Sequence, residues 1–528
     1  MPMPDQGHVV LGIEGTAWNL SAALFGDRLF SLYSSPYAPV QGGIHPREAA
    51  QHHASAMKEV IGRVLESGPH PTAVAFSQGP GLGPCLRTVA TAARTLALTL
   101  GVPLVGVNHC IAHVEIGRWA TGCDDPIVLY ASGANTQVLG YLNKCYRIFG
   151  ETLDIGLGNA LDKYARSRGL AHPGGPAIEA LARRGTPVDL PYTVKGMDLA
   201  FSGLVSAAKE SPAPVEDVCA GLQETAFAMC VEVTERALAH AGKNEVMLVG
   251  GVGANARLQE MLDRMCRERR ASFFVPEKQY LGDNGAMIAY TGKIMLEADQ
   301  VLSLEASRVI PGFRSDEVEV AWRRDTGEFA YHRADVIEQG SARGAEAVVS
   351  RSGSDVAKRR LGKGYRVPSL DQRLITERTR AEARTIAMAR RAGVPTPVIR
   401  DITRDTIIME CIEGSLLKHV LDERTAREAG RMVGRLHGAG IVHGDLTTSN
   451  IIVRDSKCVL IDFGLAQVTS EIEARGVDVH VFFQTLKSTS ADAPALRDAF
   501  IGGYEVSFPA AAEVIERERA IEARGRYL

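Results

Sequence analysis

Residues 9–16 read Val-Val-Leu-Gly-Ile-Glu-Gly-Thr, an apolar run that ends in a glycine turn. A second apolar run, residues 20–25, follows and ends at Gly26-Asp27, a pair typical of a hairpin turn. The pattern returns at residues 127–134, Ile-Val-Leu-Tyr-Ala-Ser-Gly-Ala, 118 positions later. A strand, a glycine turn and a second strand that occur twice predict two similar α/β lobes.

A third glycine element lies at residues 246–255, Val-Met-Leu-Val-Gly-Gly-Val-Gly-Ala-Asn. It is a buried type of strand that runs into a glycine turn, and an amphipathic helix is predicted after it, over residues 256–269. This geometry lets backbone N–H groups meet a phosphate. The alternative is a tight turn that only connects the strand to the helix.

The charge of the chain divides unevenly along its length. The composition of the 528 residues, 45% of them hydrophobic and 23% charged, is globular and excludes a fibrous or wholly disordered protein. Residues 1–323 carry 28 basic and 33 acidic side chains (net −5), and residues 324–528 carry 31 and 29 (net +2). A chain-wide basic field for nucleic acid is absent. The difference between the halves suggests two proteins joined in one chain.

The sequence shows no sign of a disulfide framework or a membrane anchor. The nine cysteines are scattered and none forms C-x-x-C. The first ten residues lack a basic and an apolar region of a signal peptide. No apolar run approaches the roughly 18 residues that a membrane span needs. We therefore expect a cytoplasmic protein with no membrane partner.

The composition of the sequence changes after Pro311-Gly312. Residues 315–325 are charged and predict a boundary, so we expect one domain over residues 1–323, a linker over 324–335 and a second domain over 336–528. The second domain shows short strands at 345–350 and 355–359, followed by a helix over about 372–392.

The strongest motif of the second domain is Ile441-Val-His-Gly-Asp-Leu-Thr-Thr-Ser-Asn450, followed by Val459-Leu-Ile-Asp-Phe-Gly464. Asp445 is placed to accept or orient a hydroxyl proton. Asn450 and Asp462 supply the oxygen ligands that Mg²⁺ prefers. This order and spacing predict phosphoryl transfer from ATP.

A phosphate-binding lysine is expected upstream, at the end of a strand. Lys358, in Val-Ala-Lys, fits that position. Its ion-pair partner should lie on the next helix, where Glu382 is preferred and Glu377 is the alternative.

The second domain resembles the protein-kinase superfamily, most nearly the small RIO-like atypical kinase of the KEOPS complex. The resemblance implies an α+β fold of two small lobes and ATP binding by Lys358, Glu382 and the loop Gly340, Ser341, Ala342, Arg343, Gly344, Ala345, Glu346, Ala347 and Val348. The loop departs from G-x-G-x-x-G, and the catalytic loop reads His-Gly-Asp. No Ala-Pro-Glu follows residues 462–464, so a peptide-docking segment is missing. ATP hydrolysis therefore stands beside Ser/Thr phosphorylation as an option.

A metal site is predicted in the first domain. His109 and His113 are spaced i, i+4 on one face of a helix that starts at Asn108, and two such imidazoles chelate one ion. Asp283, in Gly-Asp-Asn-Gly, offers a carboxylate, and Tyr130 ends the repeated strand. Two histidines and a carboxylate suit iron, with zinc close behind. A zinc peptidase needs glutamate after the first histidine, and here that residue is Cys110.

Five motifs of the first domain together resemble one family, the archaeal and eukaryotic tRNA threonylcarbamoyladenosine transferase, once described as an O-sialoglycoprotein endopeptidase. The resemblance covers about residues 7–320. The motifs are residues 12–17 (Gly-Ile-Glu-Gly-Thr-Ala), 78–83 (Gln-Gly-Pro-Gly-Leu-Gly), 108–113 (Asn-His-Cys-Ile-Ala-His), 130–137 (Tyr-Ala-Ser-Gly-Ala-Asn-Thr-Gln) and 250–255 (Gly-Gly-Val-Gly-Ala-Asn).

The resemblance implies the actin and heat-shock-chaperone ATPase fold, with two ribonuclease-H-like lobes around a nucleotide cleft. It implies a metal, Fe²⁺ or possibly zinc, held by His109, His113, Tyr130 and Asp283. It implies threonylcarbamoyl-adenylate binding by Tyr130, Ala131, Ser132, Gly133, Ala134, Asp162, Gly175, Glu179 and Asn255. Many relatives carry glycine where this chain has Ala134.

The implied reaction is acyl transfer to the exocyclic amine of the adenosine 3′ of a tRNA anticodon, with AMP as the leaving group. The implied partners are tRNA and other KEOPS subunits, namely a small dimerising subunit and one that docks on the kinase. The fusion of both domains points to an archaeon. The alternatives are a Ser/Thr kinase with an inert first domain, a metalloendopeptidase, and a regulatory ATPase module that gates the first domain.

Overall fold

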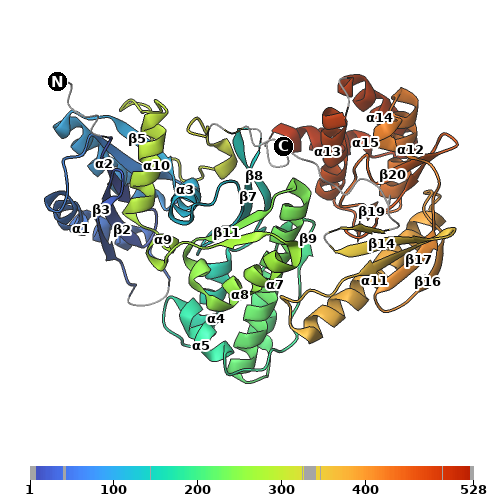
Figure 1. The fold of residues 1–528 in the computed structure, drawn as a ribbon, viewed down its shortest axis with the longest axis horizontal. Helices are drawn as coiled ribbons and strands as arrows, with labels where there is room; N and C mark the ends of the chain where they lie inside the picture. The colour runs from blue at the N-terminus through green and yellow to red at the C-terminus, as the bar shows by residue number, and fades with distance from the viewer. Residues whose placement is uncertain are drawn as a thin grey trace. The chain divides into compact units, whose positions relative to one another are not determined.

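Two separate units make up the chain (Figure 1). The computed structural model describes residues 7–39, 43–142, 144–323, 325, 341–344, 346–489 and 492–523, and it divides into residues 1–331 and 332–528. Apart from Asp325, the expected linker at 324–335 lies outside the described residues.

The first sheet of the first unit has the strand order β3-β2-β1-β4-β5. β1, β2 and β3 form an antiparallel meander, and β4 and β5 extend the sheet in parallel with β1. The strands are β1 (Val10–Glu14), β2 (Asn19–Phe25), β3 (Leu29–Pro36), β4 (Ala73–Gly79) and β5 (Leu104–Asn108).

The second sheet repeats this topology, with the order β12-β11-β6-β7-β8. β6, β7 and β8 form the meander, and β11 and β12 continue in parallel with β6. The strands are β6 (Ile127–Ala131), β7 (Thr136–Leu142), β8 (Cys145–Glu151), β11 (Glu245–Val249) and β12 (Ser272–Phe274). The repeated sequence pattern thus forms the first strand of each sheet, with Gly15 and Gly133 in the turn that follows.

Helices cover both faces of the first sheet. α1 (Pro46–Glu66) and α2 (Gly83–Leu100) pack on the face that presents Leu11 and Ile13, and α3 (His109–Thr121) and α10 (Gly285–Glu297) pack on the opposite face. Alternate residues of a strand point to opposite faces, so β1 is buried on both sides.

Helix α10 approaches β1 and β2 at backbone distance. A Cβ atom on Gly12 would lie 2.2 Å from the Ala289 nitrogen, and one on Gly285 would lie 2.5 Å from the Ala22 carbonyl carbon. These two glycines fix the height of α10 over the sheet. Asp283 lies just before this helix and is fixed with it.

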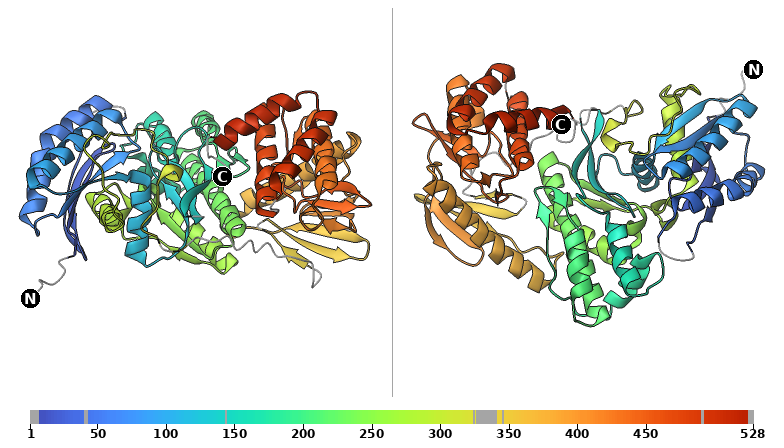
Figure 2. Two further views of the ribbon diagram at one scale, coloured as in Figure 1. Left: turned by 90° about the horizontal axis from the view of Figure 1, so that it is seen from above. Right: turned by 180° about the vertical axis from the view of Figure 1, so that it is seen from behind.

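Helix α3 lies between the two sheets, in contact with β4 and β5 of the first and with β6 and β11 of the second. The second sheet also packs against α7 (Val215–Ala241), which is buried over most of its length, and α8 (Ala256–Arg269) (Figure 2). α4 (Leu157–Ser167), α5 (Gly174–Ala182) and α6 (Ser202–Glu210) pack on α7 and on one another. The predicted helix over 256–269 is α8.

Residues 313–323, which we call the strap, belong to the first unit. Val318 and Val320 are buried against the apolar side chains of α3 and the second sheet. The exposed residues Glu317 and Glu319, which alternate with these valines, make the segment look charged, so its sequence resembles a boundary. The strap includes a short 3₁₀ helix, Ser315–Glu317.

The second unit pairs a sheet with a helical part. The antiparallel sheet has the order β13-β14-β15-β17-β16, and α11 (Pro368–Arg391) packs on it. Its strands are β13 (Ser341–Arg343), β14 (Ala347–Ser352), β15 (Asp355–Arg360), β16 (Ile399–Ile402) and β17 (Thr406–Glu410). The helical part contains α12 (Glu423–Gly438), α13 (Ile472–Thr489), α14 (Ala493–Ser507) and α15 (Ala511–Ala523), with a core of its own.

Short strands frame the predicted phosphoryl-transfer residues. β19 (Ile441–Val442) precedes Asp445, and the hairpin β20 (Ile451–Arg454) and β21 (Lys457–Leu460) separates Asn450 from Asp462. Within the described part of the chain, no helix has the length and apolar character needed to cross a membrane.

Candidate functional site

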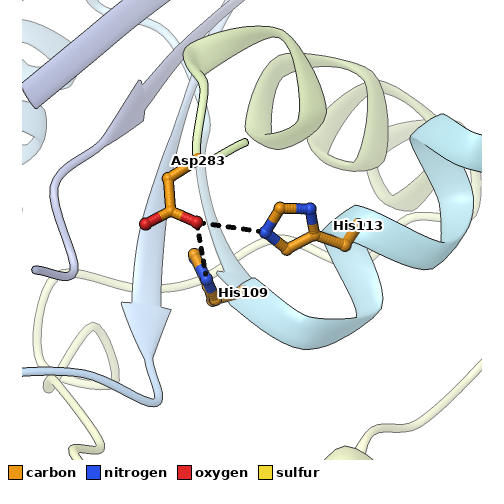
Figure 3. Close-up of side chains that lie close together, drawn as sticks. All are labelled: His109, His113 and Asp283. Atoms are coloured by element: carbon orange, nitrogen blue, oxygen red, sulfur yellow. Dashed lines mark hydrogen bonds and ion pairs between the residues drawn. The ribbon is translucent and has the colours of Figure 1, made fainter. Parts of the chain in front are cut away.

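Two histidines and one aspartate converge between the lobes of the first unit (Figure 3). The Nε2 atoms of His109 and His113 lie 3.5 and 3.3 Å from the same oxygen, Oδ1 of Asp283. The two imidazole rings stand 4.9 Å apart and nearly perpendicular. Ligand atoms held about 2.0–2.1 Å from a tetrahedral zinc ion lie about 3.4 Å from one another, so this spacing suits a shared ion.

Two helix caps hold these side chains in place. Asn108 caps α3 by accepting hydrogen bonds from the N–H groups of Cys110 and Ile111, so the helix begins at His109. Asn284 caps α10 through the N–H of Met287. Asp283 therefore does not serve as the cap of α10, and its carboxylate is directed at the histidines.

Residues behind His109 and Asp283 hold these two side chains in place, and the sequence alone assigned them no such role. Glu14 Oε2 lies 3.1 Å from His109 Nδ1, and its other oxygen accepts a 2.6 Å hydrogen bond from the Thr16 hydroxyl. The amide of Asn19 donates to the backbone oxygen of Asp283 at 2.7 Å. The motif Gly12-Ile13-Glu14-Gly15-Thr16 is recognisable in the sequence, but it does not reveal what Glu14 contacts. Only the folded structure brings Glu14 to His109, 95 residues away.

Tyr130 reaches the same place from the end of β6. Its ring centroid lies 5.2 Å from that of His113. Its hydroxyl is buried and, among the described residues, has no hydrogen-bond partner; the same holds for His113 Nδ1. A buried polar atom without a partner is costly, and a bound group that used the phenol oxygen would remove that cost. The donor set thus fits a metal ion.

The electrostatics favour charge at His109. Burial lowers its pKa, but the carboxylates of Glu14 and Asp283 outweigh burial and raise the pKa to about 9. Burial holds the pKa of His113 below its ordinary value. Burial opposes ionisation of Asp283 too, yet His109 and His113 keep its pKa low. The Asp283 carboxylate and the two imidazoles are therefore electrostatically coupled.

The residues expected to bind the adenylate surround the turn after β6. The carbonyl oxygens of Ser132 and Gly133 accept hydrogen bonds from Gly158 and Asn159, so this turn, which includes Ala131 and Ala134 at its ends, rests on the start of α4. Asp162 on α4 accepts a 2.6 Å hydrogen bond from the N–H of Gly174 at the start of α5. No described atom comes within 4 Å of a Cβ placed on Gly175, so that surface is open.

The contacts continue from α5 to α8. Glu179 accepts a 3.3 Å hydrogen bond from the N–H of Ala256 and pairs with Arg183 at 2.8 Å. Asn255 caps α8, and its amide donates to Gln223 on α7 at 3.0 Å. One chain of contacts thus joins the turn after β6 to Asp162, Glu179 and Asn255. Some of the hydrogen bonds that these residues make hold neighbouring helices together.

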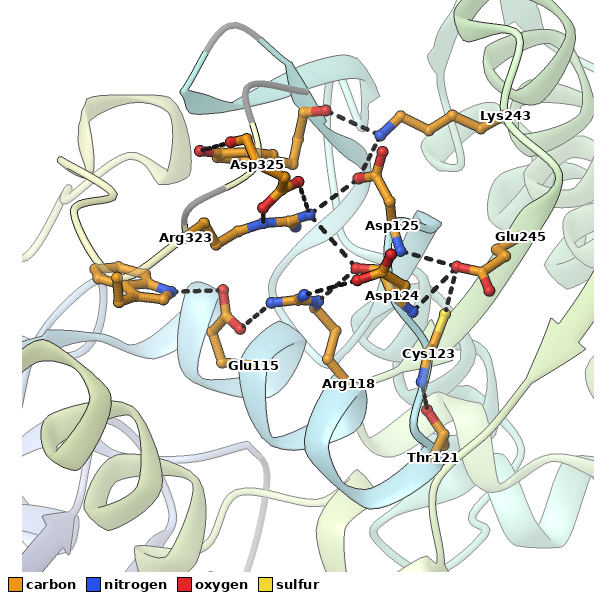
Figure 4. Close-up of polar contacts among 12 residues, drawn as sticks. Glu115, Arg118, Thr121, Cys123, Asp124, Asp125, Lys243, Glu245, Arg323 and Asp325 are labelled. Carbon is orange, nitrogen blue, oxygen red and sulfur yellow. Dashed lines mark hydrogen bonds and ion pairs between the residues drawn. The ribbon is translucent and has the colours of Figure 1, made fainter. Parts of the chain in front are cut away.

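The strap contacts α3 at its N-cap and at Glu115 near its middle, and Figure 4 shows the contacts around Glu115. The amide of Asn108 donates to the carbonyl oxygens of Phe313 and Arg314 at the start of the helix. Two residues beyond His113, the buried Glu115 accepts hydrogen bonds from Trp322 at 2.9 Å and from Arg118 at 2.7 Å.

Arg323 then closes the strap onto the second sheet. It lies 3.8 Å over the ring of Tyr141 and pairs with Asp125, which Lys243 also contacts. The end of the first unit is therefore part of the support of its histidine helix.

In the second unit, Lys358 meets both expected carboxylates. Its Nζ lies 2.6 Å from Glu382 Oε1 and 2.8 Å from Asp462 Oδ1. Glu382, and not Glu377, is thus the helix partner. The two carboxylates hold the pKa of Lys358 above its ordinary value against the effect of burial.

Asp445 and Asn450 lie together on the catalytic loop. The amide of Asn450 donates to the Asp445 carboxylate at 2.9 Å, and Asp478 holds the loop through the N–H groups of His443 and Gly444. Of the expected nucleotide loop, Ala347 and Val348 begin β14, and Glu346 directly precedes it. Ser341, Ala342 and Arg343 form β13 and Gly344 follows, whereas Gly340 and Ala345 lie outside the described residues.

Comparison with known proteins agrees with this division. Residues 30–290 match the tRNA N6-adenosine threonylcarbamoyltransferase family, and residues 355–480 match the RIO domain. The chain is 72% identical to the probable bifunctional tRNA threonylcarbamoyladenosine biosynthesis protein of Methanoculleus marisnigri, over 100% of this chain and 99% of the relative.

Proteins described in the same words share 66% identity in Methanospirillum hungatei and 47% in Methanothermobacter thermautotrophicus, each over 98% of this chain and 99% of the relative. The similarity therefore spans both units and is not confined to their motifs. This chain belongs to the family of bifunctional tRNA threonylcarbamoyladenosine biosynthesis proteins, in which a threonylcarbamoyltransferase domain is joined to a RIO domain.

Proposed function

We propose that residues 1–323 transfer the threonylcarbamoyl group of threonylcarbamoyl-adenylate to the exocyclic amine of the adenosine 3′ of the anticodon, in tRNAs that read codons beginning with A. Family membership over the full chain supports this most directly, together with the convergence of His109, His113 and Asp283. The common strand order of the two sheets supports an actin-like pair of lobes.

His109, His113, Tyr130 and Asp283 would hold the metal, which we propose to be Fe²⁺, with zinc as the alternative. When bound, the metal supplies a Lewis acid that anchors and polarises the threonylcarbamoyl group. Glu14 keeps the ring of His109 turned toward Asp283, and Asn19 holds the Asp283 backbone.

The chain's other residues bind and orient the adenylate. N–H groups of the turns after β6 and β11 are suited to hold phosphate charge, and Asp162 and Glu179 to accept hydrogen bonds from ribose or threonyl hydroxyls. The tRNA amine then attacks the carbamoyl carbon, the bond to the phosphate oxygen breaks and AMP leaves. Burial raises the pKa of the Cys110 thiol to about 12, so it stays protonated and a covalent thiocarbamate intermediate is disfavoured.

For the second unit we propose ATP binding and hydrolysis that regulates the first. Lys358 would contact ATP phosphates, Asn450 and Asp462 would hold Mg²⁺, and Asp445 would orient the attacking hydroxyl or water. Ser/Thr phosphorylation is the second candidate. We disfavour a kinase whose first unit is inert, because the first unit keeps its full donor set, and a metalloendopeptidase, because Cys110 replaces the general base.

We further propose that the protein works in the cytoplasm with other KEOPS subunits, a small dimerising one and one that docks on the kinase. The net charge of −5 over residues 1–323 supports this, because binding of polyanionic tRNA then needs basic surface from partners.

The test is synthesis of the modified adenosine from tRNA, ATP, threonine and bicarbonate, with the adenylate-forming enzyme and partner subunits present. We expect His109→Ala to abolish product and His70→Ala, at an exposed histidine, to leave it unchanged. Failure of the unaltered chain to modify tRNA would reject the transferase assignment.

The regulatory role is tested separately with Asp445→Ala, against Asp498→Ala at an exposed position of α14. We expect the first substitution to stop ATP hydrolysis and lower repeated turnover of tRNA. Equal product from both variants would reject regulation by the second unit.

A further inference from the structure

Glu382, the partner of the ATP-binding lysine, is held by a second cation. Lys358 and Arg360 are two residues apart on β15, so their side chains share one face of the strand. Lys358 binds Glu382 Oε1 and Arg360 binds Oε2, both at 2.6 Å. Arg359 lies between them and is exposed on the other face.

The second terminal nitrogen of Arg360, Nη1, reaches the hairpin of β13 and β14, which we call the nucleotide hairpin. It lies 2.9 Å from Oε2 of Glu346, which directly precedes β14. Arg378 on α11 approaches the other oxygen of Glu346 at 3.6 Å. The nucleotide hairpin and α11 are thus bridged by the guanidinium groups of Arg360, which is 6% exposed, and Arg378, which is half-buried.

Glu382 is a buried carboxylate, 3% exposed, that Lys358 and Arg360 share. A buried carboxylate that loses a cationic partner is strongly destabilised. Lys358 also contacts Asp462 at 2.8 Å and would contact ATP phosphates. Arg360 is the partner of Glu382 that also reaches Glu346 beside β14.

We propose that Arg360 is a positioning residue that couples the nucleotide hairpin to α11, so that both settle around ATP together. The proposal deepens the ATP function proposed above and rests on it. Because Arg360 contacts Glu382 on α11 and Glu346 beside β14, a shift of either element relative to the other would break one of these two ion pairs.

The test uses the full chain and measures the Kd for Mg²⁺-ATP, the KM and kcat of hydrolysis and the melting temperature. We expect Arg360→Met and Glu346→Gln each to raise Kd and KM by about tenfold, as loss of a bridging ion pair allows. Arg359→Met is the matched control and should match the unaltered chain in all four quantities.

Arg360→Lys separates positioning from charge. A lysine is a point charge and cannot bridge two carboxylates with the fork of a guanidinium. We expect Arg360→Lys to keep the melting temperature near that of the unaltered chain and still to raise KM. The double variant Arg360→Met with Glu346→Gln should be no worse than either single one.

Full recovery of KM by Arg360→Lys, or additive effects in the double variant, would overturn the coupling. The coupling would also be overturned if the Arg360→Met protein had a lower melting temperature but an unchanged Kd for ATP. That result would show that Arg360 has a structural role alone. If the unaltered chain binds no ATP, the proposed ATP function fails and this inference with it. Normal ATP binding by every variant rejects the inference alone.

Discussion

At the scale of single residues, the first unit depends on how His109 is held. Glu14 is fully buried and contacts His109 Nδ1 at 3.1 Å, so a carboxylate lies behind a proposed ligand histidine. Such partners fix the ring and its tautomer, and their loss costs about 10–100-fold in metal affinity.

We therefore expect Glu14→Gln to weaken metal binding by about that factor, because the amide no longer holds the ring as a carboxylate does. Titration of the metal-free chain with Fe²⁺ and Zn²⁺ measures it. Glu66→Gln, at an exposed position of α1, is the control. Equal affinities for the two variants would show that Glu14 does not orient His109.

The residue scale also shows where sequence reasoning ends. The i, i+4 spacing of His109 and His113 needs only helix geometry, so it was predictable. Asp283 was predictable as a carboxylate in a glycine-flanked loop, but the roles of Glu14, Asn19 and Arg360 were not. Their partners lie 95, 264 and 22 residues away in the chain, and only tertiary structure brings them into contact.

At the scale of elements, the seat of α10 on the first sheet sets the position of Asp283. A Cβ on Gly12 would meet the α10 backbone at 2.2 Å, and backbone yields less readily than a side chain. We expect Gly12→Ala to destabilise the first unit by about 3 kcal/mol, the upper end for overpacking, and to weaken metal binding with it.

Gly62→Ala is the control for that substitution. Gly62 lies within α1, and no described atom is within 4 Å of an added Cβ. Alanine there should stabilise the protein by about 1 kcal/mol. Thermal melting of both variants checks the pair, and a stable Gly12→Ala protein with normal metal affinity would contradict the close contact.

The start of α12 carries a pH-dependent cap. The N–H and hydroxyl of Thr425 hold the pKa of Asp422 below its ordinary value. A depressed carboxyl pKa gives stability that is present above the unfolded value, about 3.9, and is lost as the pH falls through the folded value.

We expect Asp422→Ala to cost about 1 kcal/mol at pH 7. Asp422→Asn keeps a capping oxygen and should cost less, with its deficit against the unaltered chain shrinking as the pH falls below about 4. Denaturant unfolding at pH 7 and pH 4 measures both. A deficit that grows toward acid would contradict the assigned role of the carboxylate.

At the scale of the whole molecule, the two units have separate cores. We expect two calorimetric transitions, because each core loses its packing at its own temperature. A non-hydrolysable ATP analogue with Mg²⁺, at about 100 times its Kd, should stabilise the second unit by about 2.7 kcal/mol. Only the melting temperature of that unit should then rise. A single transition that shifts as a whole would contradict independent unfolding.

The repeat of the first unit was predictable at this scale for a physical reason. Gly15 and Gly133 follow equivalent strands. Each tight turn needs a glycine directly after an apolar run, so both copies can be recognised from a short stretch of sequence. The parallel strands β4, β5, β11 and β12 cannot be recognised in this way, because their pairing depends on residues far along the chain. The strap resembles a boundary in the sequence because its two buried valines alternate with acidic residues that face outward.

The strap is also synthesised late in the first unit. Arg323 lies 214 residues after His109, so the ribosome makes α3 long before the segment that contacts Asn108 and Glu115. A nascent chain that has emerged only to residue 312 holds every proposed metal-binding residue but lacks Trp322 and Arg323. The full set of contacts around α3 therefore cannot form until residues 313–323 have left the ribosome.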